Sequence, residues 1–180
     1  CHHGVMRWSL GCACTPDSQW KQYLRSAINS VALLFDQYFD HFMQSSDNDP
    51  LEVRQWYGQV IARMKSEEEF IEEHFAMLTS NEKIILKYFL HGLLDRQRMY
   101  TSCGWFFEDL DRIEPKNIIA YAAQTIYWLE IALGISFYSN VSADFEKIES
   151  NRRKLNGLEI FSAAYLRQIN VRDTAQRVIE

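Results

Sequence analysis

The first 14 residues of the chain carry most of its soft metal-binding chemistry. They read CHHGVMRWSLGCAC and contain three of the four cysteines and two of the five histidines. Zinc prefers thiolate and imidazole ligands, and a closed structural zinc site needs about four of them. Cys1, His3, Cys12 and Cys14 supply that number, and Cys103 is a substitute for one of them if the two segments meet. A zinc ion is therefore one candidate cofactor of this segment.

Burial is the competing interpretation of the same thiols. A cysteine outside a disulfide most often behaves as a small buried hydrophobic residue. A single residue separates Cys1 from His3 and Cys12 from Cys14, whereas structural zinc sites usually place roughly two to four residues between paired ligands. A disulfide between cysteines so close in sequence is strained. The spacing thus favours buried structural thiols, and metal binding stays open as the alternative.

A second unusual segment combines aromatic rings with acids. Residues 97–111 read QRMYTSCGWFFEDLD, with Trp-Phe-Phe-Glu-Asp at 105–109. Flat aromatic faces cover the apolar face of a pyranose, and carboxylates accept hydrogen bonds from sugar hydroxyls. Gly104 allows a sharp turn that presents Trp105. The segment predicts either a carbohydrate contact or an aromatic cluster that packs in the core at a helix junction.

Other catalytic patterns are missing from the sequence. It has no G-x-S-x-G, H-E-x-x-H or glycine-rich phosphate loop. Nothing marks Cys103 as an activated nucleophile beside a histidine. His41, His74 and His91 fall at helix positions and are expected to be ordinary core or surface residues. We therefore do not expect the chain alone to be catalytic.

Composition restricts the class of protein. With 180 residues, 47% of them hydrophobic, the chain is expected to form one domain, 1–180. The net charge is −5, the pI is about 5.6, and the one basic cluster is 152–154, so no nucleic-acid partner is expected.

Four cysteines are too few for a disulfide scaffold, which favours the cytoplasm. The chain begins at Cys1 and shows no secretory signal, so we expect a processed chain or a fragment of a longer protein.

Residues 117–138 form a long apolar stretch that could be taken for a membrane span. Gln124 and Glu130 lie inside it, and an acid near the bilayer centre costs about 2.5–3.5 kcal/mol. A central helix, buried on all sides in a helical bundle, explains the stretch better. We therefore expect no membrane partner.

Helical periodicity and capping signals dominate after residue 15. Apolar residues recur at a spacing of three and four, and no strand pattern of useful length appears. The expected caps are Thr15, Asp49, Ser66, either Ser80 or Asn81, and Ser142. The helices are expected at 16–44, 50–65, 67–78, 81–100, 115–138, 142–154 and from 158 onward. The predicted fold is an all-α multi-helix bundle (16–180) with an irregular N-terminal segment (1–15).

Three segments of the chain resemble one family. CHHGVMRWSLGCAC resembles the signature C-x-H-G-x-x-R-W-x-x-x-C-x-C of a C-terminal domain of unknown function. The second segment, continued to residue 126, and NGLEIFSAAYLRQINV at 156–171 resemble its later segments. That domain follows a catalytic barrel in bacterial proteins related to family 57 glycoside hydrolases. Glu108 stands where the family usually has Asp, and Ala13 where it often has Gly. The matching positions are Cys1, His3, Gly4, Arg7, Trp8, Cys12, Cys14, Gln97, Arg98, Thr101, Ser102, Cys103, Gly104, Trp105, Phe106, Phe107 and Asp109.

The resemblance implies a supporting role beside a barrel. Family 57 enzymes are retaining and act on α-glucans, and their catalytic carboxylates lie in the barrel, which this chain lacks. Their helical region packs against the barrel and helps to wall the substrate cleft. The implied role is to form that cleft, with Trp105 as a stacking platform. The alternatives are a zinc-stapled module and a scaffold that packs on the barrel and exposes an apolar patch. The implied substrate-binding residues are His3, Arg7, Trp8, Arg98, Trp105, Phe106 and Asp109.

Overall fold

The computed structural model describes residues 2, 4–150, 152 and 155–179, with side chains described up to residue 171. Within these residues every element is helical, apart from two isolated β-bridges. The predicted all-α multi-helix bundle is confirmed. The elements are α1 (Met6–Ser9), the 3-10 helix η1 (Pro16–Ser18), α2 (Trp20–Ser45), α3 (Pro50–Trp56), α4 (Gly58–Ile61), α5 (Glu67–His74), α6 (Ser80–Arg98), α7 (Cys103–Phe106), α8 (Ile113–Leu133), α9 (Tyr138–Glu146) and α10 (Gly157–Ile179).

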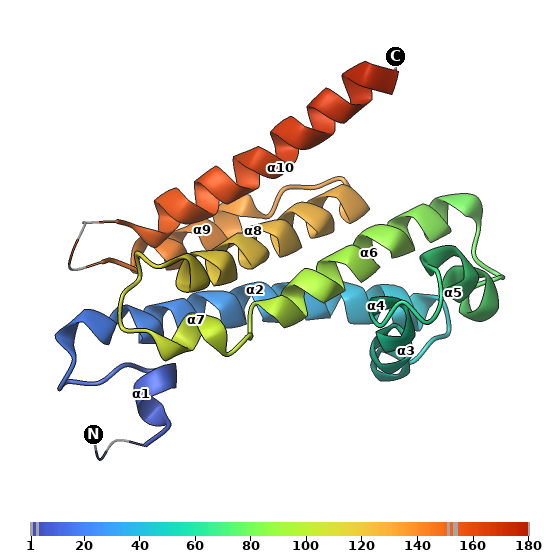
Figure 1. Ribbon diagram of the computed structural model, residues 1–180. Helices are drawn as coiled ribbons and strands as arrows, with labels where there is room; N and C mark the ends of the chain where they lie inside the picture. The colour runs from blue at the N-terminus through green and yellow to red at the C-terminus, as the bar shows by residue number, and fades with distance from the viewer. Residues whose placement is uncertain (1, 3, 151, 153–154, 180) are drawn as a thin grey trace.

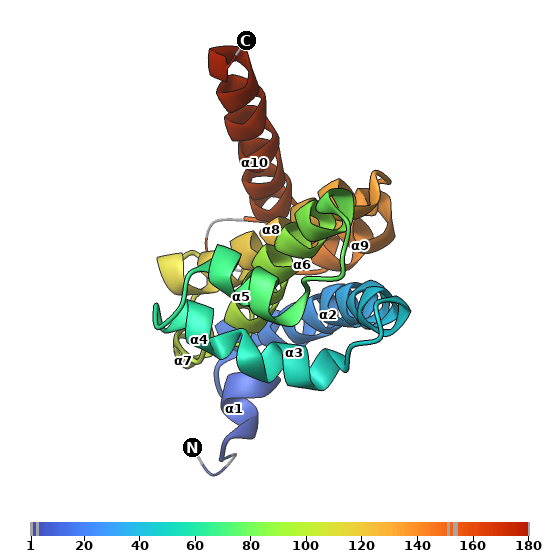
Figure 2. The same cartoon turned by 90° about the vertical axis from the view of Figure 1, so that its right-hand side faces the viewer.

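Helix α8 is the centre of the bundle. It packs against α6, α10, α2 and α7, and Figure 1 shows α2 and α6 on one side of it and α10 on the other. The short helices gather at the two ends: α1 and α7 lie at one end, and α3, α4 and α5 lie at the other (Figure 1). Viewed from the second end, α10 rises away from the body opposite to α1 (Figure 2).

The long apolar stretch of the sequence is this central helix. Ile118, Ile119, Ala122 and Ala123 have no exposed surface. The helix ends at Gly134, whose φ of 70° is left-handed and favours glycine at a helix C-terminus. No helix in the described part of the chain has the length and apolar content needed to cross a bilayer.

Aromatic rings fill the interface between α2 and α6. Phe89 is fully buried and contacts the rings of Phe35, Phe39 and Phe42 at centroid distances of 6.1, 6.0 and 5.1 Å. A Cβ at Gly92 would lie 2.5 Å from Cε2 of Phe35. Glycine at this position therefore lets the two helices approach closely.

Three of the capping predictions concern the helices at 50, 67 and 80. Asp49 caps α3 by accepting the N–H of Leu51, and Ser66 forms a reciprocal capping box with Glu69. The expectation that Ser80 or Asn81 caps α6 is wrong. Thr79 is the cap, because its hydroxyl accepts the N–H of Glu82 and the Glu82 carboxylate accepts the N–H of Thr79.

Several predicted helix bounds need correction. The helix expected at 50–65 is broken after Trp56 and resumes at Gly58, and glycine costs about 1 kcal/mol relative to alanine inside a helix. The helix expected at 142–154 is α9, which starts at Tyr138 and ends at Glu146. Ser142 is therefore not its cap.

The remaining corrections are smaller. Pro16–Ser18 is a 3-10 turn before α2, and Thr15 makes no side-chain cap there. The helix expected at 67–78 ends at His74, and the one expected at 115–138 runs from Ile113 to Leu133. The N-terminal segment, expected to be irregular, contains one helical turn, α1, and the stretch between the helices expected at 81–100 and 115–138 contains another, α7.

Candidate functional site

The two unusual segments of the sequence meet in space. Helix α1 lies against α7 (Figure 1), although about a hundred residues separate them. The Nη2 of Arg7 lies 2.6 Å from Oε1 of Glu108, and its Nε donates to the same oxygen at 2.7 Å. The rings of Trp8 and Phe106 stack with their centroids 6.3 Å apart. Both predicted segments therefore contribute to one site.

A tight turn fixes the N-terminal segment to the start of α2. Gly11 has φ of 82°, and a Cβ there would lie 2.4 Å from the carbonyl oxygen of Ser18. The Ser18 hydroxyl accepts the N–H of Cys12 at 3.0 Å and donates to the carbonyl of Thr15 at 2.7 Å. Glycine at position 11 is thus needed both for the backbone conformation and for the close approach.

Glu108 connects α1 and α2 to the segment after α7. Its carboxylate pairs with Arg7 and lies 3.4 Å from Nζ of Lys21, whose side chain is fully buried. Its carbonyl accepts the indole N–H of Trp20 at 2.9 Å. Burial lowers the pKa of Lys21, and the Glu108 charge opposes this shift. Glu108 therefore both compensates a buried cation and anchors α1.

A pocket of about 310 Å³ opens where these elements meet. We call it the aromatic pocket; it is lined by Val5, Trp8, Ser9, Arg25, Tyr100, Ser102, Trp105 and Phe106. Phe106 is 62% exposed and Trp8 45%, whereas Trp105 is only 4% exposed. The guanidinium of Arg25 covers the Trp105 ring at 4.0 Å. The ring faces available to a ligand belong to Trp8 and Phe106, and Trp105 lacks the exposed face that a stacking platform needs.

Glycine at position 104 lets α7 lie close to α8. A Cβ there would lie 2.1 Å from Cδ1 of Ile118 and 3.1 Å from the carbonyl of Glu114. The sequence expectation was that this glycine would turn the chain so as to present Trp105. Instead, the residue permits close packing, and that packing buries Trp105 while Phe106 stays at the surface.

Arg98 lies in a separate polar network. Its Nη1 donates to Oδ1 of Asp95 at 3.1 Å, and its guanidinium lies over the ring of Tyr121. The indole N–H of Trp128 donates to the other Asp95 oxygen at 3.2 Å. Burial raises the pKa of Asp95, and the hydrogen bond from Arg98 opposes this shift. This network joins α6 to α8 and does not line the aromatic pocket.

A further predicted residue, Asp109, also lies outside the aromatic pocket. Asp109 accepts the backbone N–H of Asp111 at 2.9 Å and pairs with Arg152 at 3.3 Å. His3 lies outside the described residues. The structure therefore brings Trp8, Trp105 and Phe106 together in the pocket and places Arg7 beside them.

Two residues of the pocket lining, Arg25 and Tyr100, are not among the site residues predicted from the sequence. Arg25 follows the core residue Leu24 on a predicted amphipathic helix, and the pattern there predicts a charged side chain that faces solvent. Tyr100 ends a predicted helix and reads as a core residue. Neither position carries a local signal, because both become part of the site only when α2 and α6 pack beside α7.

The cysteines are not all buried. Cys12 is buried, but Cys14 and Cys103 are exposed, which corrects the expectation that these thiols serve as small core residues. Cys12 Sγ accepts the N–H of Cys14 at 3.4 Å, and the hydrogen bond to Cys12 is the main cause that lowers the pKa of the Cys14 thiol. In the described part of the chain, no three His, Cys, Asp or Glu side chains gather as metal ligands. Cys1 and His3, the other two predicted ligands, lie outside the described residues.

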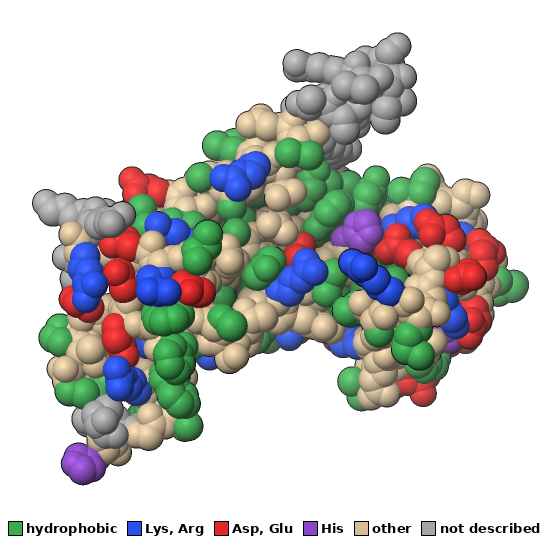
Figure 3. All heavy atoms as spheres, in the orientation of Figure 1, with side chains coloured by type: hydrophobic (Ala, Val, Ile, Leu, Met, Phe, Trp, Pro, Cys, Tyr) green, Lys and Arg blue, Asp and Glu red, His purple; other side chains and the backbone are tan. Residues whose placement is uncertain are grey.

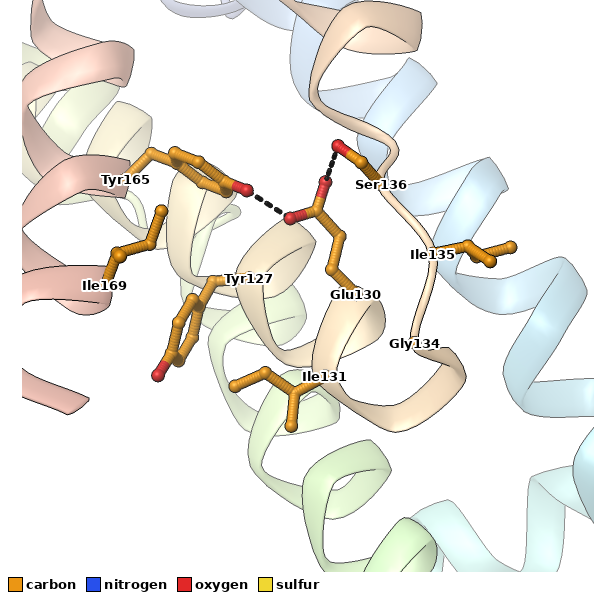
Figure 4. Close-up of a pocket in the computed structure, with 8 residues that line it drawn as sticks. All are labelled: Tyr127, Glu130, Ile131, Gly134, Ile135, Ser136, Tyr165 and Ile169. Carbon is orange, nitrogen blue, oxygen red and sulfur yellow. Dashed lines mark hydrogen bonds between the residues drawn. The ribbon is translucent and has the colours of Figure 1, made fainter. Parts of the chain in front are cut away.

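A second pocket, of about 320 Å³, lies between α8 and α10 around Glu130 (Figure 4). The Glu130 carboxylate accepts hydrogen bonds from the hydroxyls of Ser136 and Tyr165. It also accepts the N–H groups of Phe137 and Tyr138 at 2.5 and 2.8 Å, at the start of α9. Glu130 thus caps α9 from another helix, and this explains why α9 begins before the predicted Ser142.

Comparison with known proteins gives one match. The model of a family described as "Domain of unknown function (DUF3536)" matches residues 17–175. No curated protein and no solved structure matches the chain. The match covers α2 to α9 and most of α10, and it includes the second unusual segment.

Proposed function

The chain belongs to the DUF3536 family of domains of unknown function, and we propose that its aromatic pocket forms one wall of a carbohydrate site in a longer, bacterial, cytoplasmic protein that acts on α-glucans. A catalytic barrel like that of family 57 glycoside hydrolases would supply the reacting carboxylates and the opposite wall. The chain itself contributes binding surface and no catalytic group. The observation that carries the proposal is the pair of exposed, stacked rings of Trp8 and Phe106 at the pocket.

The chemistry of the pocket suits a sugar. The Trp8 and Phe106 rings are inclined by only 28°, so together they offer a broad apolar surface to the C–H face of a pyranose. Ser9, Tyr100 and Ser102, whose side chains carry hydroxyl groups, belong to the same lining. Aromatic side chains that are partly exposed to water suit a ligand, such as a sugar, that has both apolar faces and polar hydroxyl groups.

The surroundings of the pocket suit a contact with the rest of a longer protein. Hydrophobic side chains gather at the end of the molecule formed by α1 and α7 (Figure 3). Val5, Met6 and Leu10 are exposed there beside Trp8 and Phe106. A contiguous exposed apolar patch commonly marks an interaction site. The barrel would cover this rim and leave the pocket facing the glucan.

Replacing Trp8 by alanine tests the carbohydrate role. The affinity of the protein for maltoheptaose, measured by isothermal titration calorimetry, is expected to fall about tenfold, because the variant loses an apolar face worth roughly 1–2 kcal/mol. Phe106→Ala is also expected to lower the affinity for maltoheptaose. Tyr23→Ala is the control, because Tyr23 is 42% exposed and lies outside the aromatic pocket. Equal affinities in Trp8→Ala, Tyr23→Ala and the unchanged protein would reject the role.

A second candidate function is a zinc-stapled N-terminal segment. The observation that favours it is that Cys14 is exposed and lies directly beside Cys12, which a role as a buried hydrophobic residue does not explain. None of the residues of α1 is buried, so this segment has little core of its own. In this proposal Cys1 and His3 complete the ligand set; they lie outside the described residues.

Metal analysis tests the zinc proposal. Protein purified without a histidine tag is expected to hold about one equivalent of zinc, and Cys14→Ser is expected to lose most of it. His41→Ala is the control, since His41 is an exposed potential ligand on α2, outside both unusual segments. Less than about a tenth of an equivalent in the unchanged protein would rule out a tight structural site.

A further inference from the structure

Arg25 is a cation in the aromatic pocket that has no anionic partner among the described residues. Its guanidinium lies over the rings of Trp105 and Tyr100, at 4.0 and 5.6 Å. It makes no hydrogen bond and no ion pair with any residue that the structure describes. Trp105 adds a buried indole N–H that also lacks a hydrogen-bond partner among the described residues. The Trp105 N–H is therefore unsatisfied, and the donors of the Arg25 guanidinium are open to a ligand.

The other arginines that stack on aromatic rings in the described part of the chain differ from Arg25. Each of them also pairs with a carboxylate. The pairs are Arg54 with Asp36 and Asp40, Arg96 with Asp36, Arg98 with Asp95, and Arg112 with Glu114. Ring stacking is thus normally combined with charge pairing in this protein, and Arg25 departs from that pattern.

The pocket has a local charge opposite to that of the whole chain. Arg25 is the one charged residue among those that line it. Arg7 and Lys21 lie outside this lining, and both pair with the Glu108 carboxylate. The whole chain has a net charge of −5, so this excess of positive charge is local and is not a property of the surface in general.

A part-buried cation without a counter-ion binds an anion readily. Burial lowers the pKa of Arg25, because the charged form has lost hydrating water. A guanidinium holds its donors in a planar fork that fits the oxygens of a carboxylate or a phosphate, often with two parallel hydrogen bonds. The same group gives a neutral sugar only ordinary hydrogen bonds.

We propose that the aromatic pocket selects an anionic sugar derivative, with Arg25 binding its carboxylate or phosphate group while Trp8 and Phe106 contact the sugar ring. The inference rests on the proposed carbohydrate function and names the class of sugar. It assigns specificity to a residue on α2, outside the two unusual segments of the sequence. Arg25 thereby separates charged from neutral sugars that share the same apolar faces.

Calorimetric titration with glucose, glucuronate, glucose 6-phosphate and inorganic phosphate tests the proposal in the unchanged protein. At least one anionic sugar is expected to bind about tenfold or more tightly than glucose, and inorganic phosphate alone to bind more weakly than that sugar. A higher affinity for glucuronate than for glucose would show that the pocket binds a carboxylate. A higher affinity for glucose 6-phosphate would show that it binds a phosphate. Inorganic phosphate that binds as tightly as the anionic sugars would overturn the proposal.

Arg25→Gln is expected to reduce the affinity for the anionic sugars about tenfold, and the affinity for glucose by less than about threefold, because a neutral sugar loses only an ordinary hydrogen bond. Arg25→Lys keeps the positive charge but loses the planar pair of donors, so part of the preference for anionic sugars over glucose is expected to remain. Arg54→Gln is the matched control: it removes a ring-stacked arginine elsewhere, and the preference is expected to persist. An Arg25→Gln variant that folds and retains the preference would overturn the proposal.

A measurement on the unchanged protein covers the case in which Arg25→Gln fails to fold. The indole N–H signal of Trp105 and the Nε–H signal of Arg25 in ¹⁵N spectra are expected to shift with the anionic sugar and not with glucose. If glucose shifts them equally and binds equally well, this inference fails while the proposed function stands. If neither kind of sugar binds, both fail.

Discussion

Replacing Glu108 by alanine is expected to lower the free energy of unfolding by about 2–3 kcal/mol. Breaking a buried ion pair by removing one partner costs about 3–5 kcal/mol, and the partial exposure of the Glu108 side chain, 20%, reduces this. The reason is that Lys21 remains fully buried with only the carbonyl of Arg7, at 3.5 Å, as a described hydrogen-bond partner. Thermal unfolding is expected to shift down by roughly 5–10 °C.

A second substitution separates this cause from a general loss of packing. Lys21→Met in the Glu108→Ala background removes the uncompensated cation and is expected to restore most of the lost stability. Glu72→Ala is the control, because it removes a partner of Lys83 whose side chain is 67% exposed, and it is expected to leave the stability nearly unchanged. A double variant as unstable as Glu108→Ala would contradict the role given to Lys21.

The same buried cation gives stability a pH dependence. The pKa of Lys21 is lowered in the folded state, so between this pKa and the ordinary value the unfolded chain binds more protons than the folded one. Stability is therefore expected to rise with pH through this alkaline window. Glu108→Ala is expected to widen the window, and Lys21→Met to abolish it.

Replacing Phe89 by alanine is expected to cost about 3–5 kcal/mol, the usual range for deleting a buried phenylalanine. Phe89 has no exposed surface, and its ring joins α6 to three rings of α2. The cavity would open at an interface whose rigid aromatic walls collapse poorly. Chemical denaturation followed by circular dichroism measures the loss.

Phe89→Leu provides the matched control for that experiment. Leucine keeps most of the volume, so the expected cost is about 1 kcal/mol. Both variants lose the aromatic contacts, but only Phe89→Ala leaves a large cavity. The difference between their free energies of unfolding therefore measures the cost of the cavity. A cost below about 1 kcal/mol for Phe89→Ala would show that α2 and α6 do not form the core described here.

The helices could be predicted from the sequence because their signals are local. Asp49 and the Ser66–Glu69 pair mark helix starts by hydrogen bonds that span only a few residues. The early start of α9 could not be predicted, because Glu130 caps it from α8. Sequence patterns report contacts along a helix and give little information about contacts between helices.

The candidate site was predicted in outline and missed in detail for the same reason. The composition of both segments is unusual, and the structure places the rings of Trp8 and Phe106 next to each other, with their centroids 6.3 Å apart. Which tryptophan is exposed depends on how Gly104 lets α7 approach α8. The contact of Arg25 with Trp105 depends on the packing of α2 beside α7. Neither fact has a signature in the local sequence.

We propose that α1 and α7 together form a surface that contacts carbohydrate. The indole N–H signal of Trp8 in ¹⁵N-labelled protein, followed during titration with maltoheptaose, tests this contact. We predict that this signal shifts in a saturable way and that Phe106→Ala raises the Kd obtained from the titration about tenfold. A Trp8 signal that does not move up to about 20 mM maltoheptaose, a concentration at which even a weak contact saturates, would contradict the claim.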